Sequence, residues 1–196
     1  MTVLKQKGFT QRSEARGGFT LIELLIVIAI LGTLAVVVLL ALNPVQQLAR
    51  TRDSGRTSAV TQIGHAVEAY ATSNAGVYPG GTGACTVSAA SSFIDCLVTA
   101  SEIQTNPAAI TYSAGAATAC TGGTDQDANL CYDYDGTTNS FIVYATSEAD
   151  SNISRCPTGQ NGYFVYSSDA GRGGLWCGNA EPATPLAGDD AGWLAI

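Results

Sequence analysis

The chain has 196 residues, 46% of them hydrophobic, which is enough for one membrane segment and one modest globular domain. Its formal net charge of −7 is unevenly distributed: residues 1–18 carry four basic residues and one acidic residue, whereas residues 19–196 carry five arginines and fifteen acidic residues. Phosphate binding requires clustered Lys and Arg, so the acidic body argues against a nucleic-acid partner.

Residues 1–18, MTVLKQKGFTQRSEARGG, are too polar for the hydrophobic core of a secretory signal peptide. In a signal peptide the apolar core precedes the cleavage site, but here it follows the small pair Gly17-Gly18. If a segment is removed, we therefore expect it to be the polar leader, so that the apolar segment stays on the mature protein. The positive charges of the leader favour the cytoplasmic side of a membrane.

Residues 19–42 form an apolar run in which Glu23 is the only charged residue. As a helix this run would extend about 36 Å at about 1.5 Å per residue, which is enough to cross a bilayer. A buried core helix has a similar composition, but a soluble domain of this size rarely contains one. The run therefore predicts a transmembrane helix.

Asn43-Pro44 interrupts the apolar run, because proline lacks an N–H donor and clashes with the preceding turn. The same residues also make a good helix start, with Asn43 as N-cap, Pro44 at the first helical position and Gln46 at the third. We predict a break at Pro44 and then an amphipathic helix over residues 43–75. From Ala59 on, its apolar positions recur at helical spacing and form one face that needs a packing partner. The apolar positions include Val45, Leu48, Ala59, Val60, Ile63, Val67 and Tyr70.

Two polar features fall on this second helix. Arg50, Arg52 and Arg56 form the only basic cluster beyond the leader, and a juxtamembrane or inter-subunit contact is favoured there over DNA. His65 has no neighbouring Cys or His, which predicts a surface residue rather than a metal ligand.

Residues 76–196 have the composition of a separate globular head. Gly, Ser, Thr and Ala dominate to about residue 125, with one short apolar piece at residues 92–98. Strand-like segments rich in aromatic and β-branched residues follow, and turn sequences join them in pairs as hairpins. These segments are residues 130–134, 141–145, 163–166 and 175–177.

The fold class that follows is α+β, with a long N-terminal helix packed on a small antiparallel β-sheet head. The apolar face of the sheet would cover the exposed stripe of the second helix. The C-terminal stretch is predicted to be a loop as far as Trp193. We expect Trp193, Leu194 and Ile196 to dock onto the head.

All six cysteines lie within residues 76–196, and none forms a C-x-x-C pair. An even number in a small exported domain favours disulfide bonds over a zinc site. Six cysteines allow fifteen pairings, and the spacing favours nearest neighbours. The expected pairs are Cys85–Cys96, Cys120–Cys131 and Cys156–Cys177.

The head contains one candidate metal site, for calcium. DQDANL begins like a calcium loop, but Leu130 replaces the turn glycine and Gly136 stands in place of the bidentate glutamate, so the EF-hand match fails. Two interpretations of this segment remain: a calcium site built from carbonyls and aspartates, or a solvated hairpin loop. No other cofactor is expected. The four candidate ligands are Asp125, Asp127, Asp133 and Asp135. No nucleophile has a plausible base, so we do not expect an enzyme.

The stretch GGFTLIELLIVIAILGTLA, residues 17–35, resembles the N-terminus of bacterial type IV pilins and of the pseudopilins of type II secretion. The match is close from Gly18 to about Ala35, looser as far as GVYP at residues 76–79, and absent at motif level over residues 80–196. The resemblance implies cleavage after Gly18 by a prepilin peptidase, N-methylation of Phe19 and the family's glutamate at Glu23.

The resemblance also implies a pilin-like fold and self-assembly into a helical filament with the N-terminal helices at its core. Before assembly such a subunit is anchored in the inner membrane with its leader in the cytoplasm and its head outside. After assembly, which requires dedicated pilus machinery, it belongs to an extracellular filament.

Glu23 is costly in a membrane, at about 2.5–3.5 kcal/mol for a charge at the bilayer centre and less near one face. In a filament interior, the carboxylate of Glu23 and the Phe19 amine of a neighbouring subunit would neutralise each other. A mismatched register would leave a bare charge at a cost of several kcal/mol, so Glu23 would select the register. Gly32 and Pro44 are the positions where we expect the helix to break or unwind during assembly.

These features favour a structural subunit, the major pilin of a type IV pilus-like surface filament. One alternative is a pseudopilin of a type II secretion system. Another is a minor pilin that acts at the filament tip as an adhesin or DNA-binding module, although the head is small and acidic for that role.

Overall fold

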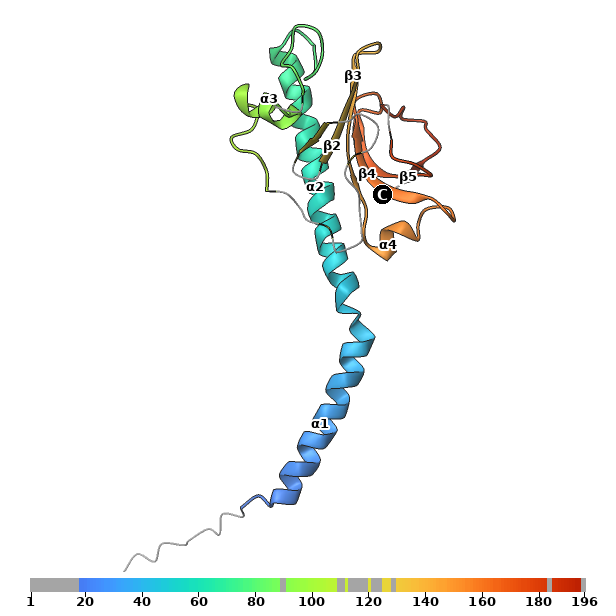
Figure 1. Cartoon of the computed structure of the whole chain (residues 1–196). Helices are drawn as coiled ribbons and strands as arrows, with labels where there is room; N and C mark the ends of the chain where they lie inside the picture. Colours follow the sequence, from blue (N-terminus) through green and yellow to red (C-terminus); the bar gives the residue numbers. More distant parts are fainter. Residues whose placement is uncertain are drawn as a thin grey trace, which may run out of the picture. The chain divides into compact units, whose positions relative to one another are not determined.

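A computed structural model describes residues 18–88, 91–108, 112, 120, 125–127, 130–182 and 185–194 (Figure 1). The chain divides into two compact units, residues 1–43 and residues 44–196. The first unit contains helix α1, and the second contains helix α2 together with the head.

Helix α1 spans Leu21–Leu42, and every side chain described on it is exposed. It is long and apolar enough to cross a membrane over residues 21–41. It continues through Gly32 in the single chain, and the unwinding expected there during assembly stays a prediction. A single glycine costs a helix about 1 kcal/mol, which the surrounding Leu and Ile residues outweigh.

The helical interruption lies at Asn43, which adopts a left-handed conformation with φ 38°. Proline disfavours the right-handed α conformation in the residue before it, and asparagine is one of the few residues that tolerate the left-handed one. The break predicted at Pro44 is therefore present one residue earlier, and Pro44 begins the next helix.

Helix α2 spans Pro44–Ser73 and buries one face against the head. Val60, Ile63, Val67 and Tyr70 are buried as the periodicity predicts, and His65 is exposed. The buried face does not extend to the start of the helix, where Val45 and Leu48 are 62% and 60% exposed.

The head is built on one antiparallel sheet whose strands lie in chain order, β1 to β6. Both predicted hairpins are present, β2 with β3 and β4 with β5. Short helices α3 and α4 precede β1 and β4, respectively. The bounds are α3 Phe93–Thr99, β1 Asp125–Asp127, β2 Leu130–Asp135, β3 Ser140–Thr146, α4 Asp150–Ile153, β4 Asn161–Ser167, β5 Arg172–Gly178 and β6 Trp193–Leu194.

One face of the sheet packs against α2 and α3, as Figure 1 shows. Side chains of β3 alternate, so Phe141 and Val143 face this core while Ile142 and Tyr144 face the opposite side. Gly64 allows α2 to approach the sheet closely, because a β-carbon there would overlap the ring of Tyr166. The α+β architecture is therefore as predicted.

The opposite face of the sheet carries a second apolar cluster that includes Tyr144, Tyr163 and Leu186. Trp193 and Leu194 form β6, which pairs with β5, so the expected docking of these two residues is confirmed. Ile196 lies outside the described residues.

Three disulfide bonds link neighbouring parts of the head. They join Cys85 to Cys96, Cys120 to Cys131, and Cys156 to Cys177. The first links the loop after α2 to α3, and the third links the segment after α4 to β5. Each bridge closes a short loop, which restricts the unfolded chain more than it adds contacts to the folded one.

We expect the protein isolated from cells and denatured without reductant to show no free thiol. Each bridge should contribute about 2–4 kcal/mol to the stability of the head in the chain-entropy account. Thiol titration and peptide mapping of the unreduced protein provide the measurement. A peptide that links Cys85 to any cysteine except Cys96 would contradict this connectivity.

Candidate processing and assembly site

The segment before α1 is open around the expected cleavage position. Gly18 and Phe19 are exposed, and Phe19 is 88% accessible to solvent. A β-carbon added at Gly18 would meet no other described atom within 4 Å. Any requirement for a small residue at Gly18 therefore arises in the enzyme that binds this segment and not in the fold of the chain.

Glu23 and Thr20 cap the start of α1. The Glu23 carboxylate accepts hydrogen bonds at Oε2 from the Thr20 backbone N–H (2.8 Å) and hydroxyl (2.7 Å). In return, the Thr20 hydroxyl oxygen accepts the backbone N–H of Glu23 (3.3 Å). This reciprocal pattern is a capping box, in which side chains satisfy backbone donors that have no partner within the helix.

The capping box explains how a single chain holds the Glu23 charge at the start of an apolar helix. The N-terminus of a helix carries a partial positive charge that favours a carboxylate. Only Oε2 is used by the cap, and among the described residues no hydrogen bond reaches Oε1, which leaves it available to a second donor. We did not predict this intrachain role, although the spacing of Thr and Glu three residues apart is its sequence signature.

Residues 15–39 match the protein-family model of the prokaryotic N-terminal methylation motif. These residues include Gly18, Phe19 and the capping box of Thr20 and Glu23. The chain carries the prepilin signature of type IV pilins and pseudopilins. No curated protein and no solved structure matches the chain.

The match is confined to residues 15–39, and it supports a subunit of the type IV pilin or pseudopilin type. It implies processing by a prepilin peptidase and a connection to pilus assembly, and the apolar α1 fits membrane anchoring before assembly. Cleavage at Gly18–Phe19, methylation of Phe19 and an inter-subunit role for Glu23 remain predictions for this chain.

The basic cluster of α2 has a role that the sequence did not indicate. Arg56 is 1% exposed, and its guanidinium bonds the carboxylates of Asp53 (2.7 Å) and Glu148 (3.1 Å). Arg52 pairs with Glu148 through two hydrogen bonds, of 2.9 and 2.7 Å. Two cations and two carboxylates thus form a charge-balanced cluster between α2 and the segment after β3, and Arg50 remains exposed outside it.

Asp53 is the centre of this cluster. It is 2% exposed and accepts hydrogen bonds from Arg56, from the Ser147 hydroxyl (2.8 Å), and from the backbone N–H groups of Glu148 (2.9 Å) and Ala149 (2.9 Å). The ring of Tyr112 lies against the Arg56 guanidinium, 3.7 Å from Cζ to the ring centre. The cluster therefore clamps α2 to the head.

We expect Asp53→Ala to lower the free energy of unfolding of the head by about 3–5 kcal/mol, since it removes one partner of a buried ion pair. The backbone donors of Glu148 and Ala149 would also lose their acceptor. Arg50→Ala, on the exposed side of the same helix, is the matched control and should change stability by less than about 0.5 kcal/mol. Chemical unfolding of the full chain, followed by near-ultraviolet circular dichroism, measures both variants, and equal effects would contradict the clamp.

The four calcium candidates are only partly described. Asp125 and Asp127 lie in β1, but their side chains fall outside the described residues. Burial raises the pKa of the Asp133 carboxyl, whereas the Thr137 backbone N–H, 2.7 Å from Oδ1, lowers the pKa of Asp135 and closes the turn between β2 and β3. Within the described part of the chain no group of three acidic, Cys or His residues converges, and calcium binding stays a prediction.

Proposed function

We propose that the protein is the major structural subunit of a type IV pilus-like surface filament. Leader cleavage between Gly18 and Phe19 would expose the start of α1, and copies of the chain would then polymerise through this helix. The observation that carries the proposal is α1 itself, which is apolar on all sides, exposed on all sides, and bears one capped carboxylate at its start.

The energetics of α1 favour a polymer over a simple anchor. Its sixteen large aliphatic residues would each cost about 1.5–3 kcal/mol in water, so the helix can leave a bilayer only if other apolar surface replaces the lipid. Neighbouring copies of α1 provide such a surface. In a simple anchor Glu23 would serve only as a helix cap, whereas in a polymer its charge would also select the register of neighbouring subunits.

The proposed orientation places the leader in the cytoplasm and the head outside. Four basic residues in the leader favour the cytoplasmic side, and three disulfides in the head require an oxidising compartment. Extraction of α1 from the membrane would need assembly machinery with its own energy source.

Imaging and mass spectrometry of filaments sheared from cells test the proposal. We expect long surface filaments whose most abundant protein is this chain, beginning at Phe19. A filament in which this chain is scarce would identify a minor pilin instead. Processed protein without any surface filament would identify a secretion pseudopilin.

A further inference from the structure

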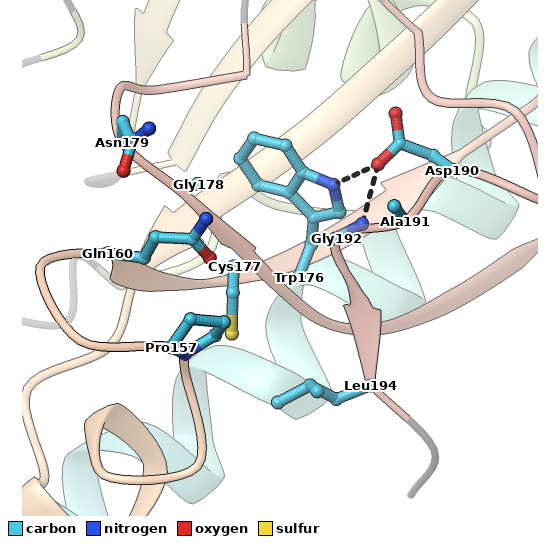
Figure 2. Close-up of a pocket in the computed structure, with 10 residues that line it drawn as sticks. All are labelled: Pro157, Gln160, Trp176, Cys177, Gly178, Asn179, Asp190, Ala191, Gly192 and Leu194. Atoms are coloured by element: carbon cyan, nitrogen blue, oxygen red, sulfur yellow. Dashed lines mark hydrogen bonds between the residues drawn. The ribbon is translucent and has the colours of Figure 1, made fainter.

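A cavity of about 320 Å³ opens on the head beside β5 (Figure 2). Its lining combines the indole of Trp176 and the side chain of Leu194 with the polar side chains of Gln160, Asn179 and Asp190. This volume lies at the lower end of the range for small-molecule sites, about 300–1,000 Å³. No residue of the proposed assembly site contributes to it.

The indole of Trp176 is held in one orientation. Its Nε1–H donates to Asp190 Oδ1 (2.8 Å), which also accepts the backbone N–H of Gly192 (2.9 Å). Gly178 and Gly192 allow this arrangement, because a β-carbon at either position would overlap the indole. The ring is therefore a rigid aromatic surface before any ligand arrives.

Polar side chains lie around this ring, and some of their donors and acceptors form no hydrogen bond within the described residues. In Figure 2, Gln160 and Asn179 lie beyond the six-membered ring of the indole, and Asp190 lies beyond its nitrogen. No hydrogen bond within the described residues uses either side-chain amide or the second carboxylate oxygen of Asp190. The disulfide between Cys156 and Cys177 ties the turn that carries Gln160 to β5.

The chemistry of the lining restricts the ligand. The cavity contains one carboxylate and no Lys, Arg or His among its lining residues, so it opposes anions such as nucleotides and phosphates. The Trp176 N–H and the Gly192 N–H lower the pKa of Asp190, which keeps its carboxylate ionised and an acceptor at neutral pH. A wholly apolar ligand would bury these polar groups without partners, at a cost in binding free energy.

We propose that this cavity binds a neutral sugar ring. The C–H face of a pyranose carries slight positive charge that matches the negative face of the Trp176 indole. Its hydroxyl groups donate to the free oxygen of Asp190 and exchange hydrogen bonds with the amides of Gln160 and Asn179. The head would then contact a glycan-bearing surface, which goes beyond the filament role proposed above.

Binding of simple sugars to the full chain in lipid nanodiscs, without sugar-based detergent, tests this site. The probes are glucose, galactose, mannose, N-acetylglucosamine and N-acetylgalactosamine up to tens of millimolar, with tetramethylammonium chloride as the cationic comparison. The Trp193→Phe variant leaves Trp176 as the only tryptophan, so its fluorescence reports on the cavity. Trp193 does not line the cavity, and this variant should bind sugar like the natural sequence.

We expect at least one of these sugars to bind saturably and to change the Trp176 fluorescence. Trp176→Leu, followed by calorimetry, should weaken that binding by about tenfold or more. Replacing both side-chain amides, Gln160→Ala with Asn179→Ala, should weaken it without affecting the fold. The proposal is overturned if none of the sugars binds, if the amide variant binds as tightly as the natural sequence, or if tetramethylammonium binds more tightly than every sugar.

Discussion

Replacing Glu23 by glutamine is expected to abolish or sharply reduce filament assembly while leaving membrane insertion and leader cleavage intact. Glutamine keeps the shape of the side chain, and it is accepted at this position of a capping box. Its amide oxygen can still accept the Thr20 N–H, so only the charge is lost. In the proposed filament, the Phe19 amine of each neighbour would then be buried without a partner, at several kcal/mol per subunit.

Thr20→Ala is the matched control for the Glu23 variant, since it removes the cap and keeps the charge. Loss of a cap hydroxyl costs about 1 kcal/mol at the helix start, which should reduce filament yield far less than the loss of charge. Counts of filaments by electron microscopy, with immunoblots of membrane-bound subunit, compare the two variants. If Glu23→Gln assembles normally while Thr20→Ala does not, Glu23 acts as a cap and not as an inter-subunit partner.

Replacing Gly18 by valine should block leader removal and thereby stop assembly. The open surroundings of Gly18 mean that the added side chain disturbs nothing in the described fold, so a processing defect would arise in recognition by the peptidase. Intact-mass analysis of the membrane fraction should then find residues 1–18 still attached.

Gly32→Ala provides the control for the Gly18 variant. It adds a side chain to a glycine of the same apolar segment, at a position where nothing lies within 4 Å, and alanine favours the helix by about 1 kcal/mol. We expect normal processing of this variant. Mature subunits that retain residues 1–18 in the natural protein would refute the cleavage site altogether.

Several parts of the molecule could be predicted from sequence because they depend on neighbouring residues. An uninterrupted apolar run leaves α1 no structure except a helix that satisfies its own backbone. The segments rich in aromatic and β-branched residues predicted the strands β2 to β5, and the turn sequences predicted the two hairpins, β2 with β3 and β4 with β5. The motif around Gly18 and Glu23 is also local, which is why a short segment suffices to recognise it.

Other features required the tertiary structure because they depend on residues far apart in the chain. Val45 and Leu48 are apolar and yet exposed, because the surface that α2 packs against begins only near Ala49. Arg56 was expected to lie in a surface basic cluster, yet a carboxylate 92 residues later in the chain pairs with it inside the protein.

The cavity beside Trp176 also could not be predicted from the sequence. Its ring is held by Asp190 and by two glycines that lack a β-carbon, and a disulfide attaches the turn that carries Gln160 to β5. None of these residues forms a motif with Trp176 along the sequence, because the hydrogen bonds and close approaches exist only after β5 and the C-terminal segment pair. Local physical chemistry determined how this protein begins its helix and forms its strands, whereas the positions of its buried charges and of its cavity were decided by which distant segments the fold brings together.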